Sequence, residues 1–142
     1  MMMVVTENTN KIIQYAQEEA ARLSSAHIEP AHLLLAVIRL GEGTFLNFGC
    51  TILDGAFVTI GNHTLLGPNC QLYTPQHPKD HILRRQTKET AHPITIGDDC
   101  WLGGNVTVCP GVTIGDRVIV AAGSVVVHDV PSDVMVAGNP AV

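Results

Sequence analysis

The sequence predicts a β-helix, a solenoid of short strands, preceded by a short α-helical hairpin. Two observations carry this prediction. Aliphatic residues recur at every sixth position over most of the C-terminal part of the chain, whereas apolar residues recur at helical spacing before residue 44. A period of six fits neither a helix nor an alternating strand, but it is typical of a β-helix in which each hexad forms one strand and a turn. We therefore expect a helical hairpin over residues 1–43 and a β-helix over residues 44–142.

The hairpin is predicted from two stretches. TENTNKIIQYAQEEAARL (6–23) repeats apolar residues at the spacing of one helix face. EPAHLLLAVIRL (29–40) predicts a second helix, with Pro30 in its first turn and Gly41 just after its end. Two such helices bury too little apolar surface to be stable alone, so we expect the pair to dock or to dimerise.

The β-helix is predicted from two runs of aliphatic residues in phase, and six consecutive hexads are hard to obtain by chance. A small or branched residue stands four places after most of these aliphatics, and glycine often follows them directly, which we expect to permit the turn. The aliphatic residues, predicted to point inward, are Ile60, Leu66 and Leu72 in the first run and Ile96, Leu102, Val108, Ile114, Val120 and Val126 in the second.

Residues 73–93, YTPQHPKDHILRRQTKETAHP, interrupt the hexads. Pro75 and Pro78 lack backbone donors and disfavour helix, so we expect an ordered loop without helix or strand in this stretch. A loop extruded from a solenoid leaves the scaffold intact and is a natural carrier of function. His77, held between the two prolines, is therefore the first candidate for catalysis, because a neutral imidazole can act as a general base near pH 7.

Composition excludes several classes of protein. The chain has 142 residues, room for one ordinary domain, and a formal net charge of −5, so neither nucleic acid nor an anionic membrane is the expected partner. No apolar run approaches the ~18 residues that span a bilayer, and no signal-peptide pattern is present; we expect a cytoplasmic protein. The four cysteines form no CxxC pair and are expected to be free core thiols, with no metal site.

From Phe45 onward the chain resembles the maltose and galactoside O-acetyltransferases of the hexapeptide-repeat family. The resemblance is carried by FLNFGCTILD, VTIGNHTLLGPNCQLYTPQHPKD, PITIGDDCWLGGNVTVCPGVTIGD and AAGSVVVHDVPSDVMVAGNP. It implies a left-handed parallel β-helix, a homotrimer with active sites between neighbouring subunits, acetyl-CoA as donor and a sugar hydroxyl as acceptor.

The same resemblance implies a role for individual residues. His77 matches the family's catalytic histidine, and Glu89 matches a glutamate on the same loop that would orient its imidazole. Asn47 and Asp54 fall where the family contacts the acceptor. The positions that the resemblance assigns to the donor are Trp101, Gly104, Ala122, Val127 and His128.

The N-terminal segment resembles a different family. IIQYAQEEAARL and HIEPAHLLLAVIRLGEG are similar to the first half-repeat of the N-terminal domain of the Clp ATPase chaperones, which docks substrates and adaptors. No GxxxxGK[ST] motif occurs, so no ATPase is expected. Clp-like sequence stands where the acetyltransferases have their own N-terminal helices and early coils, and the chain ends at GNPAV, before their usual basic tail. We therefore expect acetyltransferase activity that is weakened or lost.

Two alternatives stay open. The first is an inactive trimeric β-helix that presents the Clp-like segment, residues 1–43, to a protein partner. The second is a metalloenzyme on the same scaffold, such as a γ-type carbonic anhydrase, although His77 and His81 do not have that family's spacing. Nothing in the sequence selects among maltose, a galactoside, a lipo-oligosaccharide and an amine as acceptor.

Overall fold

The computed structural model describes residues 7–22, 27 and 37–142. These residues fall into two compact units, divided between Arg39 and Leu40. The first unit contains helix α1 (Glu7–Arg22), whose Ala16 and Ala20 are buried. Arg39 belongs to the same unit: its guanidinium lies 4.0 Å from the ring centroid of Tyr15 and 3.6 Å from the Glu18 carboxylate.

The second predicted helix lies mostly outside the described residues, since residues 28–36 are not among them. Its last part is wrong, because Ile38–Leu40 form a strand, β1, rather than a helical turn. The next residue, Gly41, donates its N–H to the carbonyl of Ile60 at 2.8 Å, which continues the pairing of β1 with the following coil. Pairing with that coil overrides the local helical pattern, and the β-helix begins earlier than predicted.

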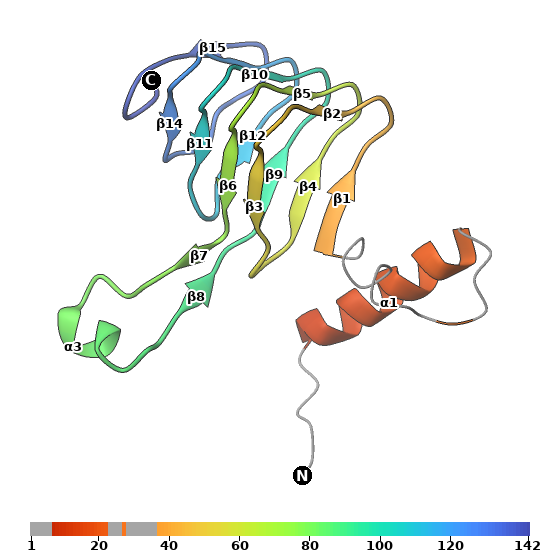
Figure 1. Ribbon diagram of the computed structural model, residues 1–142, viewed down its shortest axis with the longest axis vertical. Helices are drawn as coiled ribbons and strands as arrows, with labels where there is room; N and C mark the ends of the chain where they lie inside the picture. The colour runs from red at the N-terminus through yellow and green to blue at the C-terminus, as the bar shows by residue number, and fades with distance from the viewer. Residues whose placement is uncertain (1–6, 23–26, 28–36) are drawn as a thin grey trace. The chain divides into compact units, whose positions relative to one another are not determined.

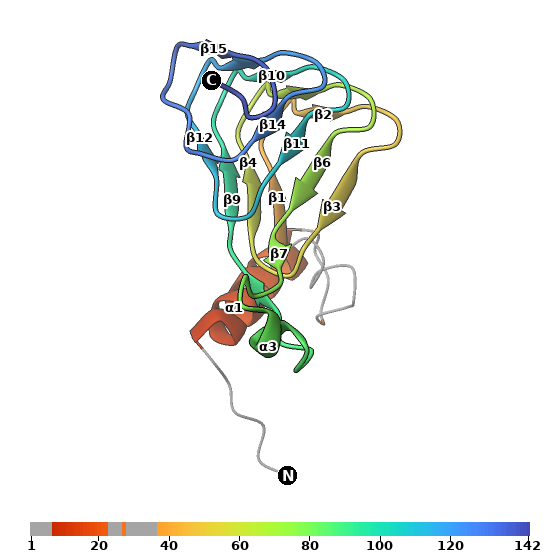
Figure 2. The same ribbon diagram turned by 90° about the vertical axis from the view of Figure 1, so that its left-hand side faces the viewer.

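Three parallel sheets form the faces of the β-helix, as Figures 1 and 2 show. Sheet 1 has the order β1 (Ile38–Leu40), β4 (Val58–Ile60), β9 (Ile94–Ile96), β12 (Thr113–Ile114). Sheet 2 has the order β2 (Phe45–Leu46), β5 (Leu65–Leu66), β10 (Trp101–Leu102), β13 (Ile119–Val120), β15 (Met135–Val136). Sheet 3 has the order β3 (Thr51–Leu53), β6 (Gln71–Tyr73), β11 (Thr107–Val108), β14 (Val125–Val126). The predicted parallel β-helix is confirmed.

The core confirms the hexad prediction. Every aliphatic residue of the two runs is buried, and residues at equal hexad positions pair across coils, as Ile96 does with Ile114 and Leu102 with Val120. The residue two places before each aliphatic is also inward-facing, because side chains two apart on a strand share a face. This second buried set consists of Val58, Thr64, Cys70, Ile94, Cys100, Val106, Val112, Val118 and Ser124.

The backbone at the corners contradicts the expectation that the glycine after each aliphatic residue permits the turn. The turn residue with positive φ is not the glycine after each aliphatic but the residue two further on, for example Asn69 (φ 57°) and Asn105 (φ 57°). The glycine is needed for a different reason: a Cβ on Gly61 would lie 2.5 Å from the carbonyl carbon of Gly97 in the next coil. Glycine at this position therefore permits close stacking of coils rather than the turn itself.

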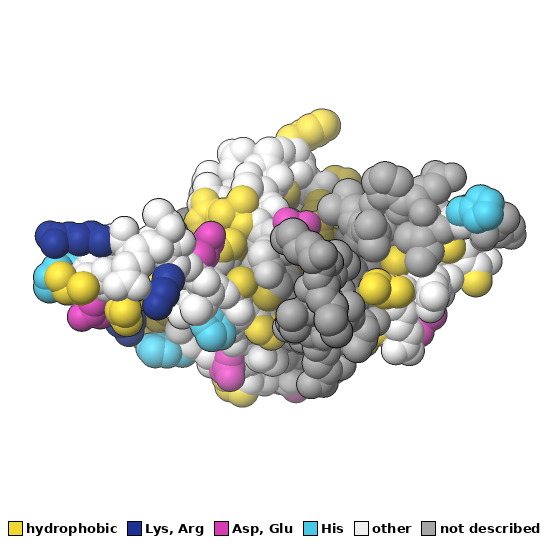
Figure 3. All heavy atoms as spheres, turned by 90° about the horizontal axis from the view of Figure 1, so that it is seen from below, with side chains coloured by type: hydrophobic (Ala, Val, Ile, Leu, Met, Phe, Trp, Pro, Cys, Tyr) yellow, Lys and Arg dark blue, Asp and Glu magenta, His cyan; other side chains and the backbone are white. Residues whose placement is uncertain are grey.

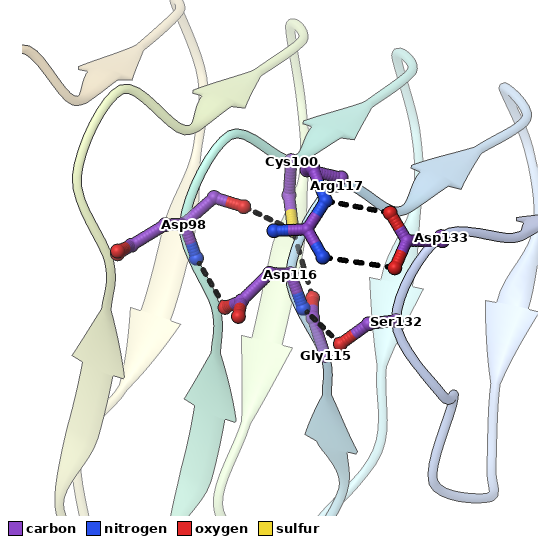
Figure 4. A network of polar contacts seen from close by, with 7 residues as sticks. All are labelled: Asp98, Cys100, Gly115, Asp116, Arg117, Ser132 and Asp133. Carbon is purple, nitrogen blue, oxygen red and sulfur yellow. Dashed lines mark hydrogen bonds and ion pairs between the residues drawn. The ribbon is translucent and has the colours of Figure 1, made fainter.

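The corner between sheets 1 and 2, called the 1–2 corner below, is lined by a polar ladder (Figure 4). The N–H of Asp98 donates to Asp116 Oδ1 at 2.9 Å, and that of Asp116 to Ser132 Oγ at 2.9 Å. In the preceding coil, the N–H of Asn62 donates to Asp98 Oδ1 at 2.7 Å. Beside it Arg117 forms a two-pronged ion pair with Asp133. Each coil thus satisfies a corner N–H of its neighbour.

The interrupting loop leaves the 3–1 corner, between sheets 3 and 1. Twenty-four residues separate Leu72 from Ile96, whereas six separate Val108 from Ile114 at the same corner. The expectation of a loop without regular structure is wrong: β7 (Pro75–Gln76) pairs with β8 (Thr90–Ala91) in an antiparallel ribbon, and α3 (His81–Arg84) lies at its end (Figure 1). Pro75 is tolerated because a two-stranded ribbon is all edge. In the part of the chain that the structure describes, no helix has the length and apolar character needed to cross a membrane.

Candidate functional site

The loop is anchored at its root by a buried threonine. Thr74 is fully buried, and its Oγ1 donates to the Leu53 carbonyl at 2.6 Å and accepts from the Ala56 N–H at 3.0 Å. A Cβ on Gly55 would lie 3.2 Å from both Pro75 Cγ and Ala91 Cβ, so glycine at this position leaves room for the base of the ribbon. The direction in which the loop leaves the β-helix is therefore fixed by contacts between the Thr74 side chain and the backbone of the preceding coil.

His77 follows β7 directly and is exposed. Its Nδ1 lies 3.2 Å from the carbonyl oxygen of Lys88, two residues before β8. A carbonyl oxygen only accepts, so Nδ1 carries the proton of the neutral ring and Nε2 presents a free lone pair. In this tautomer the nitrogen that could accept a proton from an acceptor group is Nε2.

The other loop side chains are exposed from His81 to Thr90. Figure 3 shows cationic, histidine and hydrophobic side chains at the surface of the loop's end, at the left of the view. Glu89, predicted to orient His77, is among the exposed residues, and the contact recorded for the His77 ring is the neighbouring Lys88 carbonyl. The role of Glu89 therefore stays a prediction.

Asp54, Val127 and His128 lie at the 3–1 corner with the loop. Asp54 follows β3, whose Leu53 pairs with Tyr73, so it stands next to the root of the loop. Val127 and His128 follow β14 and are exposed. Five of the predicted site residues, His77 and Glu89 included, thus belong to this corner of the β-helix or to the loop that leaves it.

Asn47, Gly104 and Ala122 lie instead at the 2–3 corner. Asn47 Oδ1 accepts from the Phe48 N–H at 2.8 Å, which leaves its Nδ2 to donate elsewhere. Gly104 and Ala122 occupy the position that carries Asp98 and Asp116 at the 1–2 corner, but neither has a side-chain oxygen. Within the described chain, no acceptor is recorded for their N–H groups, so these donors lack the partner that the ladder gives to Asp98 and Asp116.

Trp101 belongs to an exposed apolar column on the outer face of sheet 2. It is 55% exposed and stands between Leu65 (45%) and Ile119 (39%) in register. The same column continues to Phe45 and Met135 at its two ends. A row of large apolar side chains of this kind marks an interaction surface rather than a solvated face.

The cysteines are core residues, as predicted. Cys70 and Cys100 are buried, and Cys50 and Cys109 are partly buried. Burial raises the pKa of the Cys70 thiol to about 11 and that of Cys100 above its ordinary value. Both thiols donate to carbonyls, Cys70 to Gly103 at 3.2 Å and Cys100 to Gly115 at 3.0 Å. Among the described residues, no three His, Cys, Asp or Glu side chains gather as metal ligands would.

Comparison with known proteins gives the family. Residues 93–128 match the model described as bacterial transferase hexapeptide (six repeats), and residues 4–51 match the Clp repeat N-terminal domain. The chain is similar to a hexapeptide-repeat acetyltransferase of Vibrio cholerae, solved with acetyl coenzyme A, with 33% identity and a TM-score of 0.74 over 100% of this chain and 90% of that one. It belongs to the hexapeptide-repeat acetyltransferase family.

Members of the maltose and galactoside branch of this family are among the matches. A maltose O-acetyltransferase structure from Clostridium difficile is 31% identical, with a TM-score of 0.73 over 92% of this chain and 85% of that one. The galactoside O-acetyltransferase of Escherichia coli K12 is 44% identical over 103 residues, 72% of this chain and 51% of the relative. The chain spans about half the length of the curated relatives it matches. Both sequence resemblances are confirmed.

Sequence reasoning missed three features of the site. The Lys88 carbonyl is a backbone group and leaves no side-chain signal. Thr74 reads as an ordinary residue before Pro75. The helical turn α3 did have a signal, because Asp80 is a common N-cap residue, and its Oδ1 accepts from the Leu83 N–H at 2.8 Å.

Proposed function

We propose that this protein is an acetyl-CoA-dependent O-acetyltransferase that acetylates a sugar hydroxyl, with His77 as general base. The observation that carries the proposal is the bond between His77 Nδ1 and the Lys88 carbonyl, on a loop extruded from the scaffold of a known acetyltransferase family. With the proton on Nδ1, that bond leaves Nε2 unprotonated.

In the proposed reaction, Nε2 takes the proton of the acceptor hydroxyl as its oxygen attacks the thioester carbonyl carbon. The tetrahedral intermediate then collapses, the carbon–sulfur bond breaks, and the proton passes from His77 to the departing thiolate. The proton balance closes within one turnover, so direct transfer needs no acyl-enzyme. Asp54, beside the root of the loop, and the free Nδ2 of Asn47 are the proposed contacts for other hydroxyls of the sugar.

The donor is proposed to lie along the 2–3 corner. The unsatisfied N–H groups of Gly104 and Ala122 can donate to amide oxygens of the pantetheine arm, and Trp101 offers it an apolar face. A backbone N–H near the thioester would also stabilise the negative charge that develops on its oxygen. Val127 and His128 are proposed to contact the donor from the other corner.

The proposed site residues are divided between two corners of one chain, and this division supports a site shared by neighbouring subunits. We propose a homotrimer in which the exposed column of sheet 2 faces a second copy. Light scattering of the purified protein is expected to give three times the chain mass of 15.2 kDa. A monomer at micromolar concentration would contradict the trimer.

The proposed activity is tested by mass-spectrometric detection of acetylated product from acetyl-CoA and a panel of sugars. Mass detection avoids thiol dyes, with which the chain's own cysteines could react. We expect product from the wild type, and a loss of about 100-fold or more in His77→Ala, the range of general base catalysis. His81→Ala, an exposed histidine four residues further along the same loop, is the matched control and should keep wild-type activity.

Three results would contradict the proposal. Equal activity of His77→Ala and wild type would show that His77 is not the general base. Equal loss of activity in His77→Ala and His81→Ala would indicate a general effect on the loop. Absence of product with every sugar would favour the alternative of an inactive scaffold. The Clp-like match over residues 4–51 supports that alternative's protein-docking segment, which stays a prediction.

A further inference from the structure

Arg84 makes a contact on the catalytic loop that the proposed mechanism does not use. Its Nη1 donates to the carbonyl oxygens of Pro78, at 3.1 Å, and Lys79, at 3.2 Å. These are the first and second residues after His77. The loop carries three other cationic side chains, Lys79, Arg85 and Lys88, and the structure records no such contact for them. Arg84 is therefore placed to hold the backbone beside the histidine.

The geometry of α3 explains how Arg84 reaches these carbonyls. The turn begins at Asp80, whose carbonyl accepts from the Arg84 N–H at 3.0 Å, so the Pro78 and Lys79 carbonyls lie outside it. Side chains on a helix lean toward its N-terminus. The long side chain of the last residue of α3 thus folds back over the turn onto the carbonyls that precede it.

Nothing apolar holds this part of the loop in the described chain. All residues from His81 to Thr90 are exposed, and α3 has no buried residue. The chain before His77 is fixed by the pairing of Gln76 with Thr90, and the ring is fixed at Lys88. The chain after His77 is held at Arg84, so three polar tethers set the direction of the imidazole.

We propose that Arg84 is a positioning residue for His77, which keeps Nδ1 on the Lys88 carbonyl and Nε2 free. This inference rests on the proposed function for its kinetic consequence only, since the tautomer of the ring can be measured without turnover. A guanidinium suits the task because it stays charged at every working pH and offers several donors in a fixed plane. Displacement of a catalytic group by about 1 Å costs on the order of 100-fold in rate.

The test compares Arg84→Met with Arg85→Met, which removes the same charge from the adjacent residue. Arg84→Met should lower kcat about 10- to 100-fold while KM for acetyl-CoA and for the sugar stays near wild type. Arg84→Lys, which restores a cationic donor on a shorter side chain, should recover part of kcat. Arg85→Met should behave as wild type. Thermal unfolding of all variants shows whether the fold is kept.

The second readout is the 15N spectrum of the histidine rings, with His77→Ala used to assign the signal. Neutral His77 should carry its proton on Nδ1 in the wild type and Arg85→Met, and shift toward the Nε2–H form, which an unconstrained histidine side chain prefers, in Arg84→Met. Wild-type kcat and an unchanged ring signal in Arg84→Met would overturn the proposal, as would equal loss of kcat in both methionine variants. If the wild type acetylates nothing, the proposed function fails, and the ring signal alone decides the role of Arg84.

Discussion

Replacing Thr74 with valine tests whether the root of the loop over residues 73–93 depends on one buried hydroxyl. The two side chains have nearly the same volume, so the change removes hydrogen bonds and leaves little cavity. Thr74 Oγ1 is shared between the Leu53 carbonyl and the Ala56 N–H. The Leu53 carbonyl keeps a second donor, the Thr74 N–H at 3.2 Å, whereas the Ala56 N–H loses its acceptor.

The expected loss in the free energy of unfolding follows from these lost hydrogen bonds. The lost hydroxyl bond is worth about 1 kcal/mol, and a stranded N–H adds about 1–3 kcal/mol. Because Ala56 is only half-buried and water can reach part of it, we expect the lower end, about 2 kcal/mol in the free energy of unfolding. Thr74→Ser is the matched control, because it keeps the hydroxyl and loses one methyl group, about 0.8 kcal/mol.

Two measurements separate these variants. Denaturant unfolding at fixed protein concentration gives the free energy, and amide hydrogen exchange reports on Ala56 and on residues 73–93. Thr74→Val should accelerate exchange at Ala56 and along the loop, whereas Thr74→Ser should leave exchange at Ala56 near wild type. If valine costs less than about 0.5 kcal/mol, the level of an ordinary surface change, and exchange at Ala56 is unaltered, the reasoning is refuted.

Two further predictions concern the stack of coils. Gly97→Ala would place a Cβ 2.7 Å from the Gly115 carbonyl carbon, and this clash with backbone should cost about 1–3 kcal/mol in denaturant unfolding; wild-type stability would show that the coils can separate. The Cys70 thiol, with its pKa raised to about 11 from 9.0, stays neutral in the folded chain while the unfolded thiol ionises. The contribution of this thiol to the free energy of unfolding is complete below pH 9 and is lost as pH rises toward 11. The loss is at most about 3 kcal/mol. An equally steep alkaline loss in Cys70→Ala would contradict this origin.

The β-helix could be predicted from sequence because its repeat is local. Each hexad places an aliphatic residue and a partner two positions earlier on the same inward face, so burial of Ile96 or Val120 follows from spacing alone. The strand Ile38–Leu40 could not be predicted in this way. Its residues fit a helical pattern, and only pairing with the next coil, seen in the Gly41–Ile60 hydrogen bond, decides the outcome.

The candidate site was predictable in part for a similar reason. His77 stands out because prolines flank it and the hexads stop before it. Its partner was assigned to a side chain, Glu89, whereas the recorded contact is with a backbone carbonyl, which sequence patterns do not mark. Likewise the free N–H groups of Gly104 and Ala122 become visible only by contrast with the Asp98 and Asp116 ladder at the 1–2 corner.

The register of the stacked coils places equivalent residues at a regular spacing along the β-helix. The coil from Ile96 to Ile114 spans eighteen residues, and neighbouring strands lie about 4.8 Å apart. Gly104 and Ala122 therefore occupy the same position in two adjacent coils of the 2–3 corner. Inserting or removing one whole coil would lengthen or shorten the 2–3 corner by one strand spacing, about 4.8 Å. The chemistry of each corner would stay unchanged. The reach available to an elongated ligand is thus set in discrete steps by the number of repeats, independently of which side chains touch it.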